Sequence, residues 1–110
     1  MKIYNDFYGE IPIKQIGKEL REIVKKENKS FKVLTGYGST SGISQSKNAV
    51  IKSLSKMKRE GLINGFFPGE VKHMLLTTTS PYYESKLKYE KEVKKDSDYG
   101  NDGVVFIFVT

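Results

Sequence analysis

Residues 104–109 (VVFIFV) form an unbroken apolar run near the end of the chain, and this run constrains the fold more than any other segment. Turn-like residues, 96–103, precede it. An apolar run of this length next to a turn is typical of a strand that is buried on both faces. We therefore expect the chain to build a sheet in which this strand lies away from solvent.

The segments before this run alternate between strand and helix patterns. Residues 1–7, 31–34 (FKVL) and 62–67 are predicted strands. The first predicted helix lies between the first two strands, where apolar residues recur at helical spacing: Ile13, Ile16, Leu20, Ile23 and Val24. The second is predicted over residues 46–60, and its inward side consists of Ala49, Val50, Ser53, Leu54 and Met57. Gly61 ends it.

This order of elements predicts the fold class. Alternating strands and helices are typical of right-handed crossovers over a sheet. We expect an α/β fold with two layers, in which a βαβαβ-type sheet of four strands, mostly parallel or mixed, packs against two main helices. With 110 residues the chain fits one domain, 1–110. Residues 70–100 are predicted to be an insertion before the last strand, with an exposed helix of mixed charge over 82–95.

The net charge of +6 is concentrated in one part of the chain. Between Asn28 and Arg59 there is no acidic residue, whereas the rest of the chain carries 12 basic and 13 acidic residues. The basic residues of this segment are Lys29, Lys32, Lys47, Lys52, Lys56, Lys58 and Arg59. A charge concentrated in this way attracts polyanions such as nucleic acid, although lysine-rich helix faces are also common as solvated surface.

The composition excludes several kinds of chemistry. The chain has no cysteine and a single histidine, His73, so disulfides, thiolate catalysis and an ordinary structural zinc site are excluded. We expect no metal site and no cofactor. No apolar segment approaches the ~20 residues of a membrane helix, and the N-terminal MKIYNDFYGE has no apolar stretch typical of a signal peptide. We expect a cytoplasmic protein without membrane contact.

Two glycine-containing turns follow the first two predicted strands. They are DFYG, residues 6–9, and TGYG, residues 35–38. In a parallel sheet both turns leave the carboxyl-terminal edge, where ligands of α/β proteins usually bind. This edge would combine the carboxylate of Asp6, the phenols of Tyr8 and Tyr37, a glycine loop and a helix N-terminus. Backbone amides of such a loop and the helix dipole can hold a phosphate.

These turns resemble a known family. DFYG is similar to the D-L-H-G box of Smr (small MutS-related) domains, and TGYG is similar to their second box, H/T-G-x-G. GSTSGISQSKNAVIKSL resembles the family's loop and second helix, and NDGVVFIFV resembles its glycine-rich turn and last strand. The resemblance covers nearly the whole chain apart from 70–100. It implies a fold similar to the C-terminal domain of a bacterial translation initiation factor, nucleic-acid binding and, in many members, endonuclease activity on DNA or RNA.

One departure from the family concerns catalysis. Asp6 matches the family's acidic residue, but Tyr8 stands where the family usually has histidine. A histidine titrates near pH ~6.5 and exchanges protons at neutrality, whereas a tyrosine titrates near ~10. Asp6 is a candidate base or weak ligand of a divalent ion, and Tyr8 a candidate hydrogen-bond donor to phosphate or stacking partner of a base. Asp6 as a cap of its own loop is the structural alternative.

The residues predicted to bind nucleic acid lie in the second loop and on the helix behind it. They are Gly36, Tyr37, Gly38, Ser39, Thr40, Ser41, Lys47, Lys52 and Lys56. The hydroxyl of Thr35 is a further candidate for phosphate contact. Because lysines mostly neutralise phosphates and carry no base code, we expect weak sequence specificity and strong dependence on salt.

Several alternatives stay open at the level of sequence. The first function is an Smr-like nucleic-acid-binding domain with endonuclease activity. The second is a non-catalytic adaptor that docks on RNA or the ribosome and uses residues 70–100 for a protein partner. The third is an enzyme for a small phosphorylated ligand at the same loop. Asp96, Asp98, Asn101 and Asp102 resemble the start of a calcium loop but lack its later ligands, so we interpret them as a turn.

Overall fold

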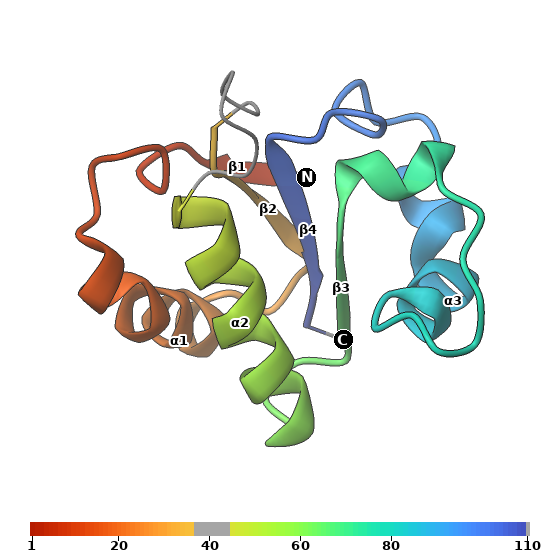
Figure 1. Cartoon of the computed structure of the whole chain (residues 1–110). Helices are drawn as coiled ribbons and strands as arrows, with labels where there is room; N and C mark the ends of the chain where they lie inside the picture. Colours follow the sequence, from red (N-terminus) through yellow and green to blue (C-terminus); the bar gives the residue numbers. More distant parts are fainter. Residues whose placement is uncertain (37–44, 110) are drawn as a thin grey trace.

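The apolar run near the C-terminus forms the inner strand β4 (Val104–Phe108) (Figure 1). All residues of this strand are buried. The computed structural model describes residues 1–36 and 45–109. Among these residues the sheet has four strands in the order β1-β2-β4-β3. The other strands are β1 (Lys2–Tyr4), β2 (Phe31–Leu34) and β3 (Gly65–Pro68), so β1 and β3 are shorter than predicted and β2 has the predicted bounds.

The sheet contains both parallel and antiparallel pairs of strands. Of the two predicted alternatives, mostly parallel or mixed, the mixed sheet is confirmed. β1 and β2 are parallel, as expected for strands joined by a crossover helix. β4 runs antiparallel to both of its neighbours, with Val105 opposite Val33 of β2 and Phe106 opposite Phe67 of β3. β1 and β2 therefore end at the same edge of the sheet, while β4 begins there.

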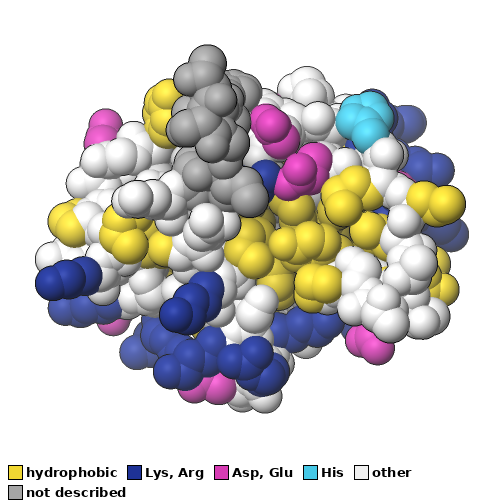
Figure 2. Space-filling view, in the orientation of Figure 1, with side chains coloured by type: hydrophobic (Ala, Val, Ile, Leu, Met, Phe, Trp, Pro, Cys, Tyr) yellow, Lys and Arg dark blue, Asp and Glu magenta, His cyan; other side chains and the backbone are white. Residues whose placement is uncertain are grey.

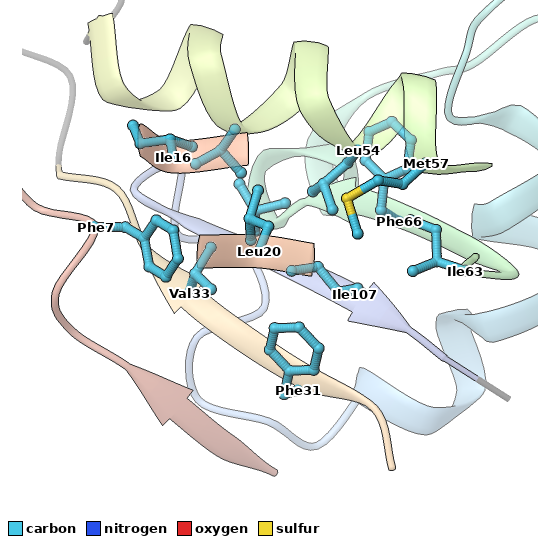
Figure 3. Packing of buried hydrophobic residues seen from close by; sticks show 12 residues of the cluster. Phe7, Ile16, Leu20, Phe31, Val33, Leu54, Met57, Ile63, Phe66 and Ile107 are labelled. Atoms are coloured by element: carbon cyan, nitrogen blue, oxygen red, sulfur yellow. The ribbon is translucent and has the colours of Figure 1, made fainter. Parts of the chain in front are cut away.

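Two helices cover the first face of the sheet, as predicted. They are α1 (Ile16–Lys26), which follows the short 3-10 turn η1 (Ile13–Gln15), and α2 (Gln45–Arg59). Figure 3 shows their apolar side chains meeting those of the strands, and the labelled residues include Ile16, Leu20, Leu54, Met57, Val33 and Ile107. This cluster holds α1 and α2 on the sheet by burial of apolar surface.

A helical layer also covers about half of the second face of the sheet. The predicted two-layer arrangement is therefore wrong for that half, where the sheet lies between two helical layers. The helix α3 (Tyr83–Val93) packs there with the 3-10 turn η2 (Gly69–His73), on the side opposite to α1 and α2 (Figure 1). The ring of Tyr89 stacks on Phe108, with ring centres 4.3 Å apart. The prediction of a helix in the 70–100 segment is confirmed, but Tyr89 and Val93 are buried. The physical reason is that β4 presents apolar side chains to both faces.

A largely buried cluster of charged side chains lies beside β2 on this second face of the sheet. Lys32 is 8% exposed, and its Nζ lies 2.8 Å from Asp96 Oδ1 and 2.8 Å from Asp98 Oδ2. The predicted basic surface therefore loses Lys32. In the turn region 96–103, the Asp98 amide donates to Asp96 Oδ1 (2.9 Å), and the Gly103 amide donates to the side-chain oxygen of Asn101 (2.9 Å). This supports the turn interpretation, and the two carboxylates bind an ammonium group.

The cluster shifts the ionisation of its members. Burial disfavours the charged form of Lys32, but the hydrogen bonds to Asp96 and Asp98 outweigh it and raise the pKa of Lys32. Burial also disfavours the charged form of Asp96, yet the hydrogen bonds from Lys32 and from the Asp98 amide lower the pKa of Asp96 overall. The folded protein thus favours the charged state of both partners.

Residues 1–36 and 45–109 contain neither a candidate membrane-spanning helix nor a candidate cluster of metal ligands. No helix there is long and apolar enough to cross a bilayer. In that same part of the chain no three His, Asp or Glu side chains are grouped so that they could hold a metal ion.

We expect Asp96→Asn to lower the free energy of unfolding at pH 7 by about 2 kcal/mol, because Lys32 loses one of its charged partners. The pKa of Asp96 in the folded protein lies below its ordinary value of 3.8. Its contribution is therefore complete above the unfolded-state pKa and is lost as the pH falls through the folded-state pKa. Urea denaturation of both proteins should show their difference shrinking below about pH 4.

Asp102→Asn is the matched control, because Asp102 lies in the same turn region but is exposed. The free energy of unfolding of this variant should lie within about 0.5 kcal/mol of that of the parent protein. Equal losses in the two variants would contradict the role given to the buried cluster.

Candidate functional site

The turn after β1 is fixed by a buried phenylalanine. The side chain of Phe7 lies in the core beside Val33 of β2 (Figure 3). The Ile11 amide donates to the Asp6 carbonyl (3.1 Å), and Gly9 has a φ of +82°, a left-handed conformation that favours glycine. Because Phe7 points inward, its neighbours Asp6 and Tyr8 point outward: both are exposed, and the Tyr8 side chain is 57% exposed.

The Tyr8 ring lies against the end of β2. Gly36 has a φ of +99°, and a Cβ placed on it would come within 2.3 Å of Tyr8 Cε2. Gly36 is buried, and no larger residue fits under the ring in this arrangement. The turn after β1 and the end of β2 are therefore in contact at the carboxyl-terminal edge of the sheet, as the parallel pairing of these strands predicts.

The end of β2 is also tied to the turn before β4. The Thr35 amide donates to the Gly103 carbonyl (2.7 Å), and the Thr35 hydroxyl donates to the same oxygen (3.1 Å). Thr35 is buried, so its hydroxyl is not available to a phosphate, contrary to the prediction. Its role is to hold Gly36 in place under Tyr8.

Most of the predicted phosphate loop carries no structural assignment here. Tyr37, Gly38, Ser39, Thr40 and Ser41 lie outside the described residues. The helix α2, which is the next described element of the chain, begins at the same end of the sheet as the turn after β1 and the end of β2 (Figure 1). Its first turn contains no acidic residue, which suits an anion near the helix N-terminus.

The three lysines predicted to bind nucleic acid have different surroundings. Lys47 forms an ion pair with Glu70 of η2, and its side chain is largely buried. Lys52 and Lys56 are exposed, and they lie one helical turn apart, about 6 Å along the axis. The structure therefore leaves Lys52 and Lys56 on the surface and brings Lys47 to a carboxylate.

A groove between α1 and α2 brings Lys56 together with three basic residues of α1 that the sequence analysis did not single out. We call it the basic groove, and it is lined by Gly17, Lys18, Arg21, Glu22, Lys25, Ser53 and Lys56. Its volume is about 380 Å³. The helices approach closely at its floor, since a Cβ on Gly17 would lie 3.2 Å from Ser53 Oγ. Figure 2 shows Lys and Arg side chains gathered in the lower part of this face, over α1 and α2.

The sequence contained a signal for this groove. Lys18, Arg21 and Lys25 recur at i, i+3 and i+7, which places them on one side of a helix, apart from the apolar stripe. The net charge along the sequence did not reveal these cations, because Glu19, Glu22 and Glu27 of the same segment cancel their charge. Arg21 is partly neutralised in the structure, since its guanidinium lies 2.6 Å from the carboxylate of Glu60, the residue that follows α2.

A second hollow connects the basic groove with the turn after β1. It has a volume of about 430 Å³, and its lining includes Asp6, Glu22 and Lys25. Because Glu22 and Lys25 also line the basic groove, the two hollows adjoin. Glu19 and Glu22 make this second hollow less favourable to an anion than the groove. The carboxylate of Asp6 therefore lies at one end of a surface whose other end is cationic.

Comparisons of the chain with protein-family models, with curated proteins and with solved structures found no match.

We expect Gly36→Ala to destabilise the protein by about 1 kcal/mol more than Gly9→Ala. Both glycines have a positive φ, so both variants strain the backbone. A Cβ at Gly36 also meets the Tyr8 ring, whereas a Cβ at Gly9 meets nothing within 4 Å. Thermal or urea denaturation of the two variants measures the difference.

The same comparison in a Tyr8→Ala background serves as the control. Removing the ring removes the clash but leaves the backbone strain. The two glycine substitutions should then lower the free energy of unfolding by nearly the same amount. A difference that persists without the ring would contradict the contact between Tyr8 and Gly36.

Proposed function

We propose that this chain is an Smr-like nucleic-acid-binding domain, with a fold similar to the C-terminal domain of a bacterial translation initiation factor. The observation that carries the proposal is the basic groove, in which Lys18, Arg21 and Lys25 of α1 face Lys56 of α2. The resemblance of DFYG and TGYG to the family's two boxes supports the same function.

The charges of the groove suit a phosphate backbone. Lys18, Lys25 and Lys56 are exposed cations around this hollow. Lys52 lies outside the groove but is exposed one helical turn before Lys56. Each lysine that neutralises a phosphate releases a counterion, so binding should weaken with salt by a slope of about −0.7 to −0.9 per contact. Since lysine reads phosphate charge and no base edge, the expected binding is weakly specific.

The exposed Tyr8 ring adds a preference for unpaired bases. It is supported from below by Gly36 and offers its outer surface at the edge of the sheet. Stacking of a base on an aromatic side chain contributes about 1–3 kcal/mol and is tolerant of sequence. We therefore propose that the target contains single-stranded DNA or RNA next to the segment held in the basic groove.

The basic groove is tested by charge reversal. We expect Lys18→Glu with Lys25→Glu to weaken binding to a fluorescent single-stranded oligonucleotide by at least about tenfold at low salt. Lys52→Glu with Lys56→Glu should have a similar effect. Anisotropy titrations at several salt concentrations should also show the slope of log K against log salt reduced by about 1.4 to 1.8 in each variant.

The matched control is Lys72→Glu with Lys88→Glu. These exposed lysines lie on η2 and α3, away from the groove, and the variant has the same net charge as the other two. It should bind nearly as well as the parent protein. An equal loss in all three variants would mean that only total charge matters, and the proposed site would be wrong.

Phosphodiester cleavage is a second candidate, favoured by two exposed side chains of the turn after β1, the Asp6 carboxylate and the Tyr8 phenol. The carboxylate would act as a base toward the attacking oxygen or bind one divalent ion, and Tyr8 would donate to a phosphate oxygen. On this proposal, labelled RNA or plasmid DNA is cut in the presence of Mg²⁺ or Mn²⁺, and Asp6→Asn abolishes cutting while binding persists.

Asp102→Asn is the control for that experiment, since it removes an exposed carboxylate elsewhere. Intact substrate at high protein concentration, together with oligonucleotide binding that depends on Lys18 and Lys25, would favour the non-catalytic adaptor on RNA or the ribosome. Cutting that survives Asp6→Asn would exclude Asp6 as the base.

A further inference from the structure

An apolar groove lies on the opposite side of the molecule from the basic groove. It is formed by the segment after η2 and by the outer side of α3, and its volume is about 290 Å³. Its apolar lining includes Met74, Leu75, Leu76 and Leu87, and we call it the leucine groove. The side chain of Leu75 is 99% exposed and that of Leu87 is 69% exposed, which is unusual for two leucines of one hollow.

The two walls of the leucine groove are joined by hydrogen bonds from one lysine. The ammonium of Lys86 on α3 donates to the carbonyl of Val71 (2.8 Å) and to the carbonyl of Met74 (3.0 Å). These bonds hold the segment that carries Leu75 against the helix that carries Leu87. A hollow that exists before binding reduces the ordering cost that a ligand must overcome.

The rim of the leucine groove is cationic. Lys91 and Lys94 line it near the end of α3, whereas the acidic residue of the lining, Glu90, accepts a hydrogen bond from the Tyr99 hydroxyl (2.5 Å). A partner that fills the groove with apolar side chains therefore meets lysines at its flank. Electrostatic complementarity then requires acidic residues on the partner.

We propose that the leucine groove binds an acidic amphipathic segment of another protein, which inserts apolar side chains between Leu75 and Leu87 and places carboxylates next to Lys91 and Lys94. A helix laid in a groove with apolar anchors at i, i+3 or i+4, and i+7 matches this chemistry. A second copy of this chain fits less well, because both partners would carry a net charge of +6. Nucleic acid fits less well too, because phosphates gain nothing from aliphatic side chains.

The proposal is tested by selecting random peptides of about 16 residues on the full chain. A phage-displayed library is first depleted on the Leu75→Ser, Leu87→Ser variant and then selected on the parent protein. Both leucines are exposed, so this variant should keep the parent's circular dichroism and melting temperature. We expect enriched peptides with apolar residues at helical spacing and an excess of Asp and Glu.

The affinity of one synthetic enriched peptide then separates the contributions. Leu75→Ser with Leu87→Ser should weaken it by at least about tenfold through lost apolar burial. Lys91→Glu with Lys94→Glu should weaken it by about fivefold or more at low salt. Leu62→Ser, an exposed leucine outside the groove, should leave it unchanged, and so should Lys18→Glu with Lys25→Glu, which separates this site from the proposed nucleic-acid site.

Each remaining outcome would overturn the proposal. One such outcome is that no peptide is enriched on the parent protein relative to the serine variant. Another is that the enriched peptides have no excess of Asp and Glu. A third is that the affinity of the peptide is the same in the Lys91→Glu, Lys94→Glu variant as in the parent protein. Dimerisation of the parent protein that is lost in the serine variant would assign the groove to a second copy. Oligonucleotide affinity that falls in the serine variant would assign it to nucleic acid.

Discussion

Burial of β4 on both faces is the constraint on which the rest of the structure depends. Its alternate side chains point to opposite sides of the sheet, and none of them is polar. Exposing either face would leave a large aromatic or aliphatic surface in water, so two separate layers of helix are needed. The helices α1 and α2 supply one layer, and η2 with α3 supplies the other. The segment 70–100 is therefore part of the core structure and not an appendage.

The two helical layers carry the two surfaces that we propose as binding sites. The layer of α1 and α2 combines an apolar inner side with outward cations, and the close approach at Gly17 brings those of both helices around one groove. The layer of α3 uses its inner side to cover β4 and leaves leucines on its outer side. A polyanion and an acidic amphipathic segment could thus bind without competing for the same side chains.

The sequence predicted much of the fold and part of the site. The spacing of apolar residues located α1 and α2 to within a few residues, and FKVL gave β2 its observed bounds. The placement of DFYG and TGYG after parallel strands predicted a common edge of the sheet, and the structure adds the contact between Tyr8 and Gly36 at that edge. The covering of the second face could also have been inferred, because a strand buried on both faces excludes a sheet with one bare side.

What the sequence determined by itself is therefore the order of the elements, the inner position of β4 and the common edge of the sheet at which the turns after β1 and β2 lie. Only the tertiary structure decided which charges remain on the surface. Lys32 binds Asp96, which is 64 positions away, and Lys47 binds Glu70, which is 23 positions away, whereas Lys56 joins cations from α1. The physical reason is that the energy of a charge depends on its neighbours in space and on its burial, and neither is set by local sequence.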